Sequence, residues 1–222
     1  MWTLYHVWLS PACRKVRIVL AEKQIDFQLV SEKTWQRREE FLALNPAGEA
    51  PVLVHTSGSV VAESGAICEY LEETCPEPAL IGESALERAE TRRLVAWFDG
   101  KFQREVTANI TEEKMMKRML RGGSPDSQAL RAGYANLQTH LAYITWLTDR
   151  RNWLAGDQFS LADIAAAAHL SALDYLGDVP WDDHEAVKTW YSRVKSRPSF
   201  RIILADHIPG LPPPPHYANL DF

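Results

Sequence analysis

Residues 45–71 hold the feature that most constrains how this chain can fold. Two short apolar runs, at residues 52–54 and 60–62, flank a polar turn around Gly58, and this pattern predicts a β-hairpin. Ser64 follows directly and is placed to cap a helix whose apolar residues recur at helical spacing. Backbone donors at a helix start can bind an anionic group, and a neighbouring strand edge can pair with an extended peptide.

The proline and acidic residues of this stretch give it a resemblance to a known family. Ala50-Pro51-Val52, followed by Glu63-Ser64, resembles the glutathione-binding half of the glutathione S-transferase superfamily. The resemblance implies that Pro51 is cis and that Ala50 pairs with the cysteinyl backbone of glutathione. It also implies that Ser64 holds the γ-glutamyl carboxylate while Glu63 holds the amine. The expected glutathione-binding residues are therefore Ala50, Pro51, Val52, Glu63 and Ser64, and an unrelated hairpin followed by a capped helix is the alternative.

Composition excludes several other classes of protein. A chain of 222 residues with 46% hydrophobic and 24% charged residues is typical of a globular protein with a sizeable core. The net charge of -5 argues against nucleic acid as a partner, and no apolar run reaches the ~20 residues that a membrane span needs. The three cysteines show no metal-ligand spacing, so we expect reduced thiols, no metal and a cytoplasmic protein.

The first 75 residues are expected to form a thioredoxin-like domain in the order βαβαββα. The predicted elements before the hairpin are a strand at 3–8, a helix from Pro11, a strand at 25–30 and a short charged helix at 34–44. The strand–helix–strand order favours a parallel pair with a right-handed crossover. On the helix after Pro11, the apolar residues at 16 and 18–21 should be buried, and Arg14, Lys15 and Arg17 should lie outside.

The rest of the chain reads as helical. Two prolines close together indicate that residues 76–84 form a linker. Residues 85–207 are then expected to form an all-helical domain, and residues 208–222 a Pro-rich tail. Ser160 with Asp163 forms a capping-box pattern, which also resembles the cap of the transferases' central helix. The other predicted helices cover residues 86–120, 128–147, 185–194 and 200–205. The fold expected from the resemblance is therefore that of the cytosolic glutathione S-transferases.

Ser10 is the candidate catalytic residue. A transferase must hold the thiol of glutathione as thiolate, and a hydroxyl donor near a helix start favours that anion. Ser10 lies at the turn before the first helix, where the zeta- and omega-like classes have their catalytic serine or cysteine. The alternative is that Ser10 only caps the helix. Cys13 is a rival thiol, for which we favour a core role, and the acidic Glu49 would repel the glycyl carboxylate of glutathione.

The C-terminal segment is the least usual part of the chain. Four prolines at 212–215 predict an extended spacer that holds the segment after it away from the body of the protein, in position to dock on its own dimer or on a partner. Together with Trp35, this tail resembles that of the FzlA-like division proteins, transferase-fold proteins that bind the tubulin-like polymer protein FtsZ. The partner-binding residues in that case are expected to be Trp35, Asp221 and Phe222.

Two functions follow from these patterns. The first, which the sequence favours slightly, is a homodimeric glutathione transferase that uses glutathione as co-substrate and transfers it to a small electrophile. The second is a non-catalytic protein of the same fold that binds FtsZ through its tail. In either case we expect dimerisation through the helix that contains Tyr70 and the helix at residues 86–120.

Overall fold

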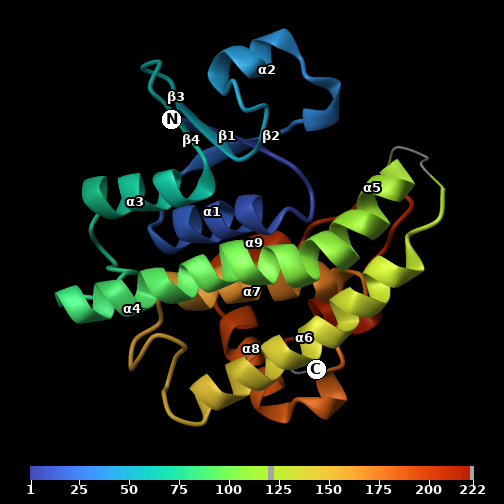
Figure 1. The fold of residues 1–222 in the computed structure, drawn as a ribbon. Helices are drawn as coiled ribbons and strands as arrows, with labels where there is room; N and C mark the ends of the chain where they lie inside the picture. Colours follow the sequence, from blue (N-terminus) through green and yellow to red (C-terminus); the bar gives the residue numbers. More distant parts are fainter. Residues whose placement is uncertain (120–122, 221–222) are drawn as a thin grey trace. The chain divides into compact units, whose positions relative to one another are not determined.

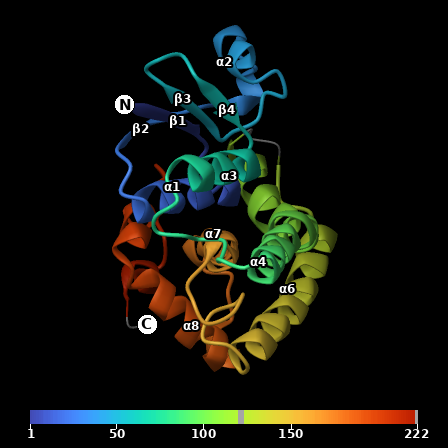
Figure 2. The same cartoon turned by 90° about the vertical axis from the view of Figure 1, so that its left-hand side faces the viewer.

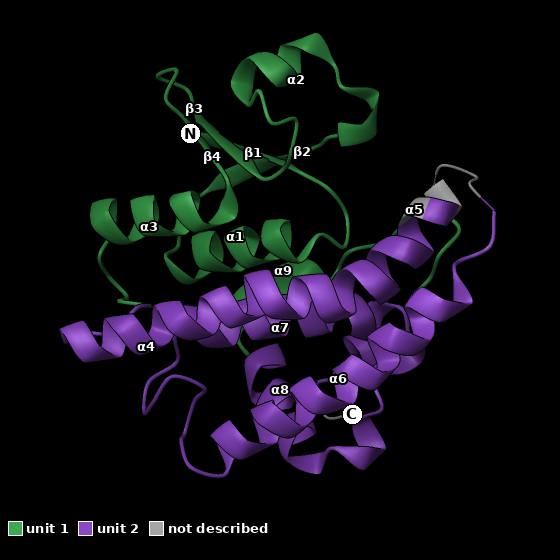
Figure 3. Ribbon diagram, viewed as in Figure 1, with its two compact units in different colours: residues 1–80, 197–212 green, residues 81–196, 213–222 purple. Residues whose placement is uncertain are grey.

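The computed structural model describes residues 1–119 and 123–220, and it divides the chain into two compact units (Figure 3). The first unit contains residues 1–80 and 197–212, and the second contains residues 81–196 and 213–222. The first holds all four strands and the second is helical, which confirms the predicted fold class. The sequence does not indicate that residues 197–212 group with the first unit, and the predicted domain boundaries stay predictions.

The first unit is built on a four-stranded mixed sheet with strand order β2-β1-β3-β4 (Figure 1). The strands are β1 (Trp2–His6), β2 (Phe27–Ser31), β3 (Val52–His55) and β4 (Val60–Ala62). β1 and β2 are parallel, as the crossover rule predicts, and β3 pairs antiparallel with both β1 and β4. Leu4 lies opposite Leu29 and Leu53, and both Leu4 and Leu53 are fully buried.

Helices cover both faces of this sheet. They are α1 (Pro11–Glu22), η1 (Thr34–Gln36), α2 (Glu39–Leu44), α3 (Ser64–Thr74), η4 (Pro198–Phe200) and α9 (Arg201–Leu204). α1 and α3 lie side by side against one face, and α2 lies on the other (Figures 1 and 2). The single helix predicted at 34–44 is wrong, because Arg37 adopts a left-handed φ of 46° and separates η1 from α2.

Three cationic side chains of α1 correct the sequence-based orientation of that helix. Arg14, Lys15 and Arg17 were expected outside, but their exposed fractions are 1%, 0% and 3%. Asp206, in the 197–212 part of the unit, explains the burial of the two arginines. Its carboxylate accepts hydrogen bonds from Arg14 Nη2 at 3.1 Å and from Arg17 at 2.8 and 2.9 Å. Arg17 also donates to the carbonyl of Ile202 at 2.8 Å.

The second unit packs its helices around α7. Its helices are α4 (Ala85–Ala96), η2 (Trp97–Glu112), α5 (Glu113–Met119), α6 (Ser127–Thr148), α7 (Leu161–Tyr175), η3 (Trp181–Asp183), α8 (Glu185–Lys195) and η5 (Pro215–Ala218). Every residue of α7 is buried, which its run of alanines permits, and α4, α6 and α8 surround it (Figure 2). The long helix predicted from residue 86 is present, but its middle part, η2, is π-helical.

The start of α7 confirms the predicted capping box. Ser160 Oγ accepts from the amide of Ala162, and the carboxylate of Asp163 accepts from the amide of Ser160 at 3.0 Å. Asp163 also accepts from the amide of Leu154 and from Trp190 Nε1, each at 2.9 Å. Burial raises the pKa of this carboxyl, although these hydrogen bonds oppose the rise. The acid therefore fastens the preceding loop and α8 to the start of the central helix.

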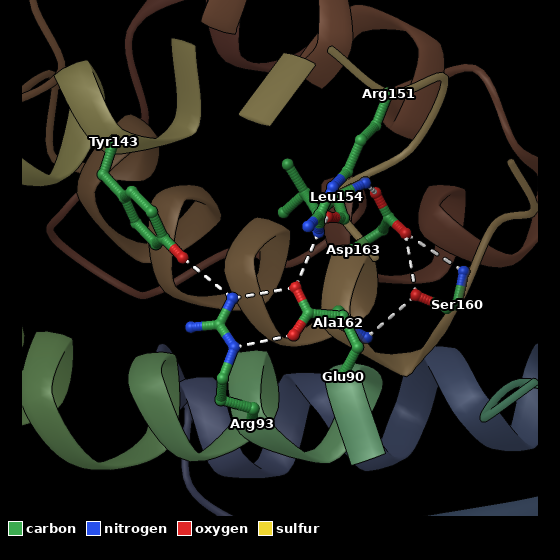
Figure 4. Close-up of polar contacts among 8 residues, drawn as sticks. All are labelled: Glu90, Arg93, Tyr143, Arg151, Leu154, Ser160, Ala162 and Asp163. Atoms are coloured by element: carbon green, nitrogen blue, oxygen red, sulfur yellow. Dashed lines mark hydrogen bonds and ion pairs between the residues drawn. The ribbon is translucent and has the colours of Figure 1, made fainter. Parts of the chain in front are cut away.

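A second polar network joins α4 to this region (Figure 4). Glu90 on α4 accepts two hydrogen bonds from Arg93, at 2.7 and 2.8 Å, and one from Arg151 at 2.7 Å. Arg93 also donates a hydrogen bond to the hydroxyl of Tyr143 on α6, and Arg151 donates one to the carbonyl of Leu154. The hydrogen bond from Arg93 is the main cause that lowers the pKa of Glu90 to about 2. This network holds three parts of the helical unit together.

The C-terminal segment differs from its prediction. The prolines at 212–215 were expected to exclude helix and to hold the following residues away from the body of the protein, but Pro215–Ala218 forms the short helix η5. Proline suits the first turn of a helix because its missing N–H needs no partner there. Tyr217 is fully buried, with its ring 5.1 Å from that of Tyr175. The tail is thus part of the helical core up to η5, and Asp221 and Phe222 lie outside the described residues.

Candidate functional site

The structure brings together the two halves of the predicted glutathione site. The Ala50–Pro51 peptide bond is cis, as the resemblance implies, and Val52 opens β3. The amide of Glu63 donates to the carbonyl of Pro51 at 3.3 Å. Because Val52 also pairs with Ala62, the start of β3 lies directly beside the start of α3. Ala50, Pro51, Val52, Glu63 and Ser64 therefore share one edge of the first unit.

Glu63 caps α3, and the prediction that Ser64 does so is wrong. Glu63 has a φ of 77°, which turns its carboxylate over the first turn of the helix. That carboxylate accepts from the amides of Gly65 at 2.9 Å and Ala66 at 3.0 Å, and from Ser64 Oγ at 3.1 Å. Ser64 is instead the first helical residue and is 4% exposed. A carboxylate at the cap reaches the amides of the first turn in the way that a serine hydroxyl was expected to do.

The electrostatics of Glu63 favour its charged form. Partial burial of its oxygens opposes ionisation, but the amides of Gly65 and Ala66, the Ser64 hydroxyl and the nearby Lys15 together hold its pKa below the ordinary value. An ionised carboxylate can bind the amino group of a ligand with its remaining lone pairs. Lys15 is a residue that the sequence reasoning missed, because the helical pattern placed it outside.

Ser10 is the N-cap of α1. Its Oγ accepts from the amide of Cys13 at 3.4 Å, so the capping role that was left as an alternative is present. A hydroxyl that accepts one hydrogen bond still has its own proton to donate. The side chain is half-buried at the turn between β1 and α1. The geometry is therefore compatible with capping and with donation to a bound thiolate at the same time.

Cys13 lies in the core, one turn into α1. It is 1% exposed, and its Sγ accepts from the amide of Val7 at 3.4 Å. Burial raises the pKa of this thiol, against the hydrogen bond from Ser10. A protonated, enclosed thiol is a poor nucleophile, and this supports the core role that the sequence favours.

The loop before Pro51 is the segment that the family resemblance assigns to the glycyl end of glutathione. Glu49 is exposed there, and Asn45 Nδ2 orders the loop by donating to the Glu49 carbonyl at 2.8 Å. Arg38 is held by Glu32 through hydrogen bonds of 2.6 and 3.2 Å. The guanidinium of Arg37 is close to the loop, since a Cβ added at Gly48 would lie 3.3 Å from Arg37 Nη1. Of the three cations that could offset the charge of Glu49, Arg37 is thus beside the neighbouring Gly48, and Arg38 is bonded to Glu32.

The residues predicted for partner binding are not brought together by the described part of the chain. Trp35 is half-buried in η1, and Asp221 and Phe222 fall outside the described residues. Within residues 1–119 and 123–220, no cluster of three or more His, Cys, Asp or Glu side chains could hold a metal ion. Over the same residues, no helix is both long and apolar enough to span a membrane.

Comparison with known proteins finds a matching family model for each of the two parts of the chain. A family model of the glutathione S-transferase N-terminal domain matches residues 9–74, and one of the C-terminal domain matches residues 125–198. FtsZ-localized protein A of Caulobacter vibrioides is 53% identical over 223 residues, which cover 99% of this chain and 98% of that protein.

Solved structures show the same likeness. A glutathione S-transferase from Rhodospirillum rubrum has 60% identity and a TM-score of 0.98, and the match covers 100% of both chains. FzlA from C. crescentus has 53% identity and a TM-score of 0.97, over 100% of this chain and 99% of that one. A less similar glutathione S-transferase from Methylobacterium radiotolerans, solved in complex with glutathione sulfonate, has 29% identity and a TM-score of 0.75, over 93% of this chain and 97% of that one.

Proposed function

This chain belongs to the glutathione S-transferase family, and we propose that within it the protein works in cell division by binding FtsZ through its C-terminal segment. The observation that carries the proposal is the 53% identity with FtsZ-localized protein A, which extends over 99% of this chain. This identity is far above what the shared fold alone requires, because a solved structure of the same fold has only 22% identity to this chain.

The C-terminal segment supports this function. Tyr217 is buried in the helical unit, so the described residues that follow it, up to Leu220, start from a defined place. Leu220, Asp221 and Phe222 combine apolar side chains with a negative charge, a combination that suits a protein surface with a basic residue beside an apolar pocket. Trp35 is the second candidate contact, since a half-buried tryptophan has part of its ring available to a partner.

The test is pelleting with polymerised FtsZ. At about 1–10 μM protein, a range in which moderate affinities are measured, we expect the chain to sediment with FtsZ polymers and to stay in the supernatant without them. A chain that stays in the supernatant in both conditions would contradict the proposal.

Glutathione binding with thiol transfer is a second candidate function, and the hydrogen bond that joins Glu63 to Pro51 favours it. The family binds glutathione, and in this chain Ala50 would pair with its backbone while the Glu63 carboxylate takes its amino group. Ser10 would donate to the thiolate, whose ordinary thiol pKa of about 8.5 has to fall for transfer to a small electrophile at neutral pH.

Two features place this activity second. The amides of Gly65 and Ala66 are already bonded to Glu63, and the exposed, acidic Glu49 belongs to the loop in which the glycyl carboxylate is expected. Thermal unfolding with and without glutathione tests binding: a ligand at 100 times its dissociation constant adds about 2.7 kcal/mol to the free energy of unfolding. An unchanged melting temperature at about 10 mM glutathione, a concentration that populates even millimolar sites, would remove this candidate.

The proposal also includes a cytoplasmic homodimer that forms through α3, which contains Tyr70, and through the continuous helix of α4, η2 and α5. Leu86 on α4, an apolar side chain that is 81% exposed, supports it. Light scattering should give twice the monomer mass of 25.2 kDa. A monomer at micromolar concentration would contradict this part.

A further inference from the structure

Asp174, in the last turn of α7, is a buried acid that gathers groups from three other elements. It is fully buried, and its Oδ1 accepts from Trp181 Nε1 of η3 at 2.9 Å. Tyr191 of α8 donates to Oδ2 at 3.4 Å. The third group comes from the tail: His216 Nε2 lies 3.1 Å from Oδ1. Because a carboxylate accepts, the Nε2 of His216 is the donor in this pair.

Lys195, at the end of α8, contacts the same part of the tail from a second direction. It is also fully buried, and its Nζ donates to the carbonyl of His216 at 3.2 Å while lying 4.0 Å from Asp174 Oδ2. Burial is the main cause that lowers the pKa of Lys195 to about 8, against the attraction of Asp174. His216 is thus held by its side chain and by its backbone, through two charged residues of opposite sign.

The next residue adds apolar contact to these polar ones. Tyr217 is fully buried, and its ring meets that of Tyr175 edge-on, at 77°. Its amide donates to the carbonyl of Pro214 at 3.0 Å, and the amide of Asn219 donates to the carbonyl of His216 at 3.1 Å. The apolar contact favours one register, because a shift by one residue would bring His216 or Ala218 to the place of the buried Tyr217 ring. The hydrogen bonds of Asp174 and Lys195 fix the register, since a buried charge left without its partner is costly.

We propose that Asp174 and Lys195 form an anchor that fixes His216 and Tyr217 in one register, and thereby positions Asn219 and Leu220, the next residues outside η5, for the partner protein. The inference rests on the proposed binding of FtsZ, and it makes these two residues positioning residues that do not themselves touch the partner. A segment that is ordered before binding loses less conformational entropy on association. The occupant that suits the acidic, apolar end of the chain is a basic surface with an apolar pocket.

Two variants each remove one of the two hydrogen bonds by which the anchor holds His216. His216→Ala removes the bond to Asp174 at a side chain that is 38% exposed, so the fold should survive. Lys195→Met removes the bond to the His216 carbonyl and keeps an unbranched apolar stem. His216→Gln retains a side-chain donor and should restore the behaviour of the wild type. The matched controls are His207→Ala, at an exposed histidine, and Lys188→Met, elsewhere on α8.

Hydrogen exchange measures the anchor without any partner. In His216→Ala and Lys195→Met, we expect the amides of Tyr217 and Asn219 to exchange at least ~10-fold faster than in the wild type, because their hydrogen bonds depend on the docked segment. Both controls and His216→Gln should exchange like the wild type. Unchanged exchange rates in the two anchor variants would overturn the anchor, independently of the result of FtsZ pelleting.

Pelleting with polymerised FtsZ then measures the positioning role. The two anchor variants should bind ~5- to 10-fold more weakly than the wild type, and the controls and His216→Gln should bind equally well. Faster exchange with unchanged FtsZ binding would overturn the positioning role and leave the proposed function standing. A wild type that does not pellet at all would overturn the proposed function itself, and the positioning role with it.

Discussion

The guanidinium of Arg17 bonds both carboxylate oxygens of Asp206, at 2.9 and 2.8 Å, and each of the two side chains is only 3% exposed. Arg14 bonds the same carboxylate, so one acid compensates two buried cations. Asp206→Asn should therefore lower the free energy of unfolding by about 3–5 kcal/mol, the cost of leaving buried charge uncompensated. Urea unfolding measures it, with the exposed Asp26→Asn as control. A loss below about 1 kcal/mol, typical of exposed pairs, would contradict this role.

His6 makes stability depend on pH in the acid range. It is 1% exposed, and burial, followed by the charge of Arg17, lowers its pKa to about 4, against an attraction from Asp206. Between pH 6.5 and about 4 the unfolded chain binds a proton at His6 that the native state does not. The free energy of unfolding should thus fall on acidification through this window, by about 3 kcal/mol from this group. His6→Gln should flatten the decline, whereas curves with equal slopes would refute the assignment.

Ser10 caps α1 and is also the candidate catalytic residue, and two different measurements distinguish these roles. Ser10→Ala removes the cap of α1 and should cost about 1 kcal/mol of unfolding free energy. If the protein turns over glutathione, the same change should lower kcat/KM about 10- to 100-fold, the effect of losing one charge-assisted hydrogen bond. Cys13→Ala is the comparison, and it should leave kcat/KM nearly unchanged because the thiol is buried. The reverse order of effects would move the chemistry to Cys13.

Tyr217 belongs to the core, although it lies only five positions before Phe222. Tyr217→Ala should cost about 3–5 kcal/mol, as expected for a large aromatic side chain removed from a packed site. His207→Ala, at an exposed side chain, should change the free energy of unfolding by less than about 0.5 kcal/mol, the usual range for surface changes. Thermal unfolding of both variants checks the contrast. Equal stability of Tyr217→Ala and the wild type would mean that the segment is not docked.

Local signals in the sequence predict much of this structure. The turn around Gly58 defines the hairpin, and Ser160 with Asp163 marks the start of α7, because both signals act within a few residues. Pro51 could be identified as cis through the resemblance to a family. The cap of α3 shows where local reasoning fails. Serine is the commoner cap, and nothing local indicates that Glu63 takes a φ of 77° and caps the helix itself.

The remaining differences come from contacts distant in the sequence. Arg17 looks like an exposed residue of an amphipathic helix, because the acid that neutralises it, Asp206, lies 189 residues away. The prolines before His216 look like the start of a free tail, because the groups that receive it, Asp174 and Lys195, lie on other helices. Pairings of this kind depend on the assembled tertiary structure, and a single sequence does not reveal them.

FtsZ binding through the tail is the central claim, and charge reversal at Asp221 tests it most directly. The measurement is pelleting with polymerised FtsZ, using the wild type, Asp221→Lys and, as a control with the same charge change at an exposed acid, Asp26→Lys. We expect the wild type and Asp26→Lys to pellet equally, and Asp221→Lys to bind about 10-fold more weakly through loss of charge complementarity. Equal pelleting of all three proteins would contradict the claim.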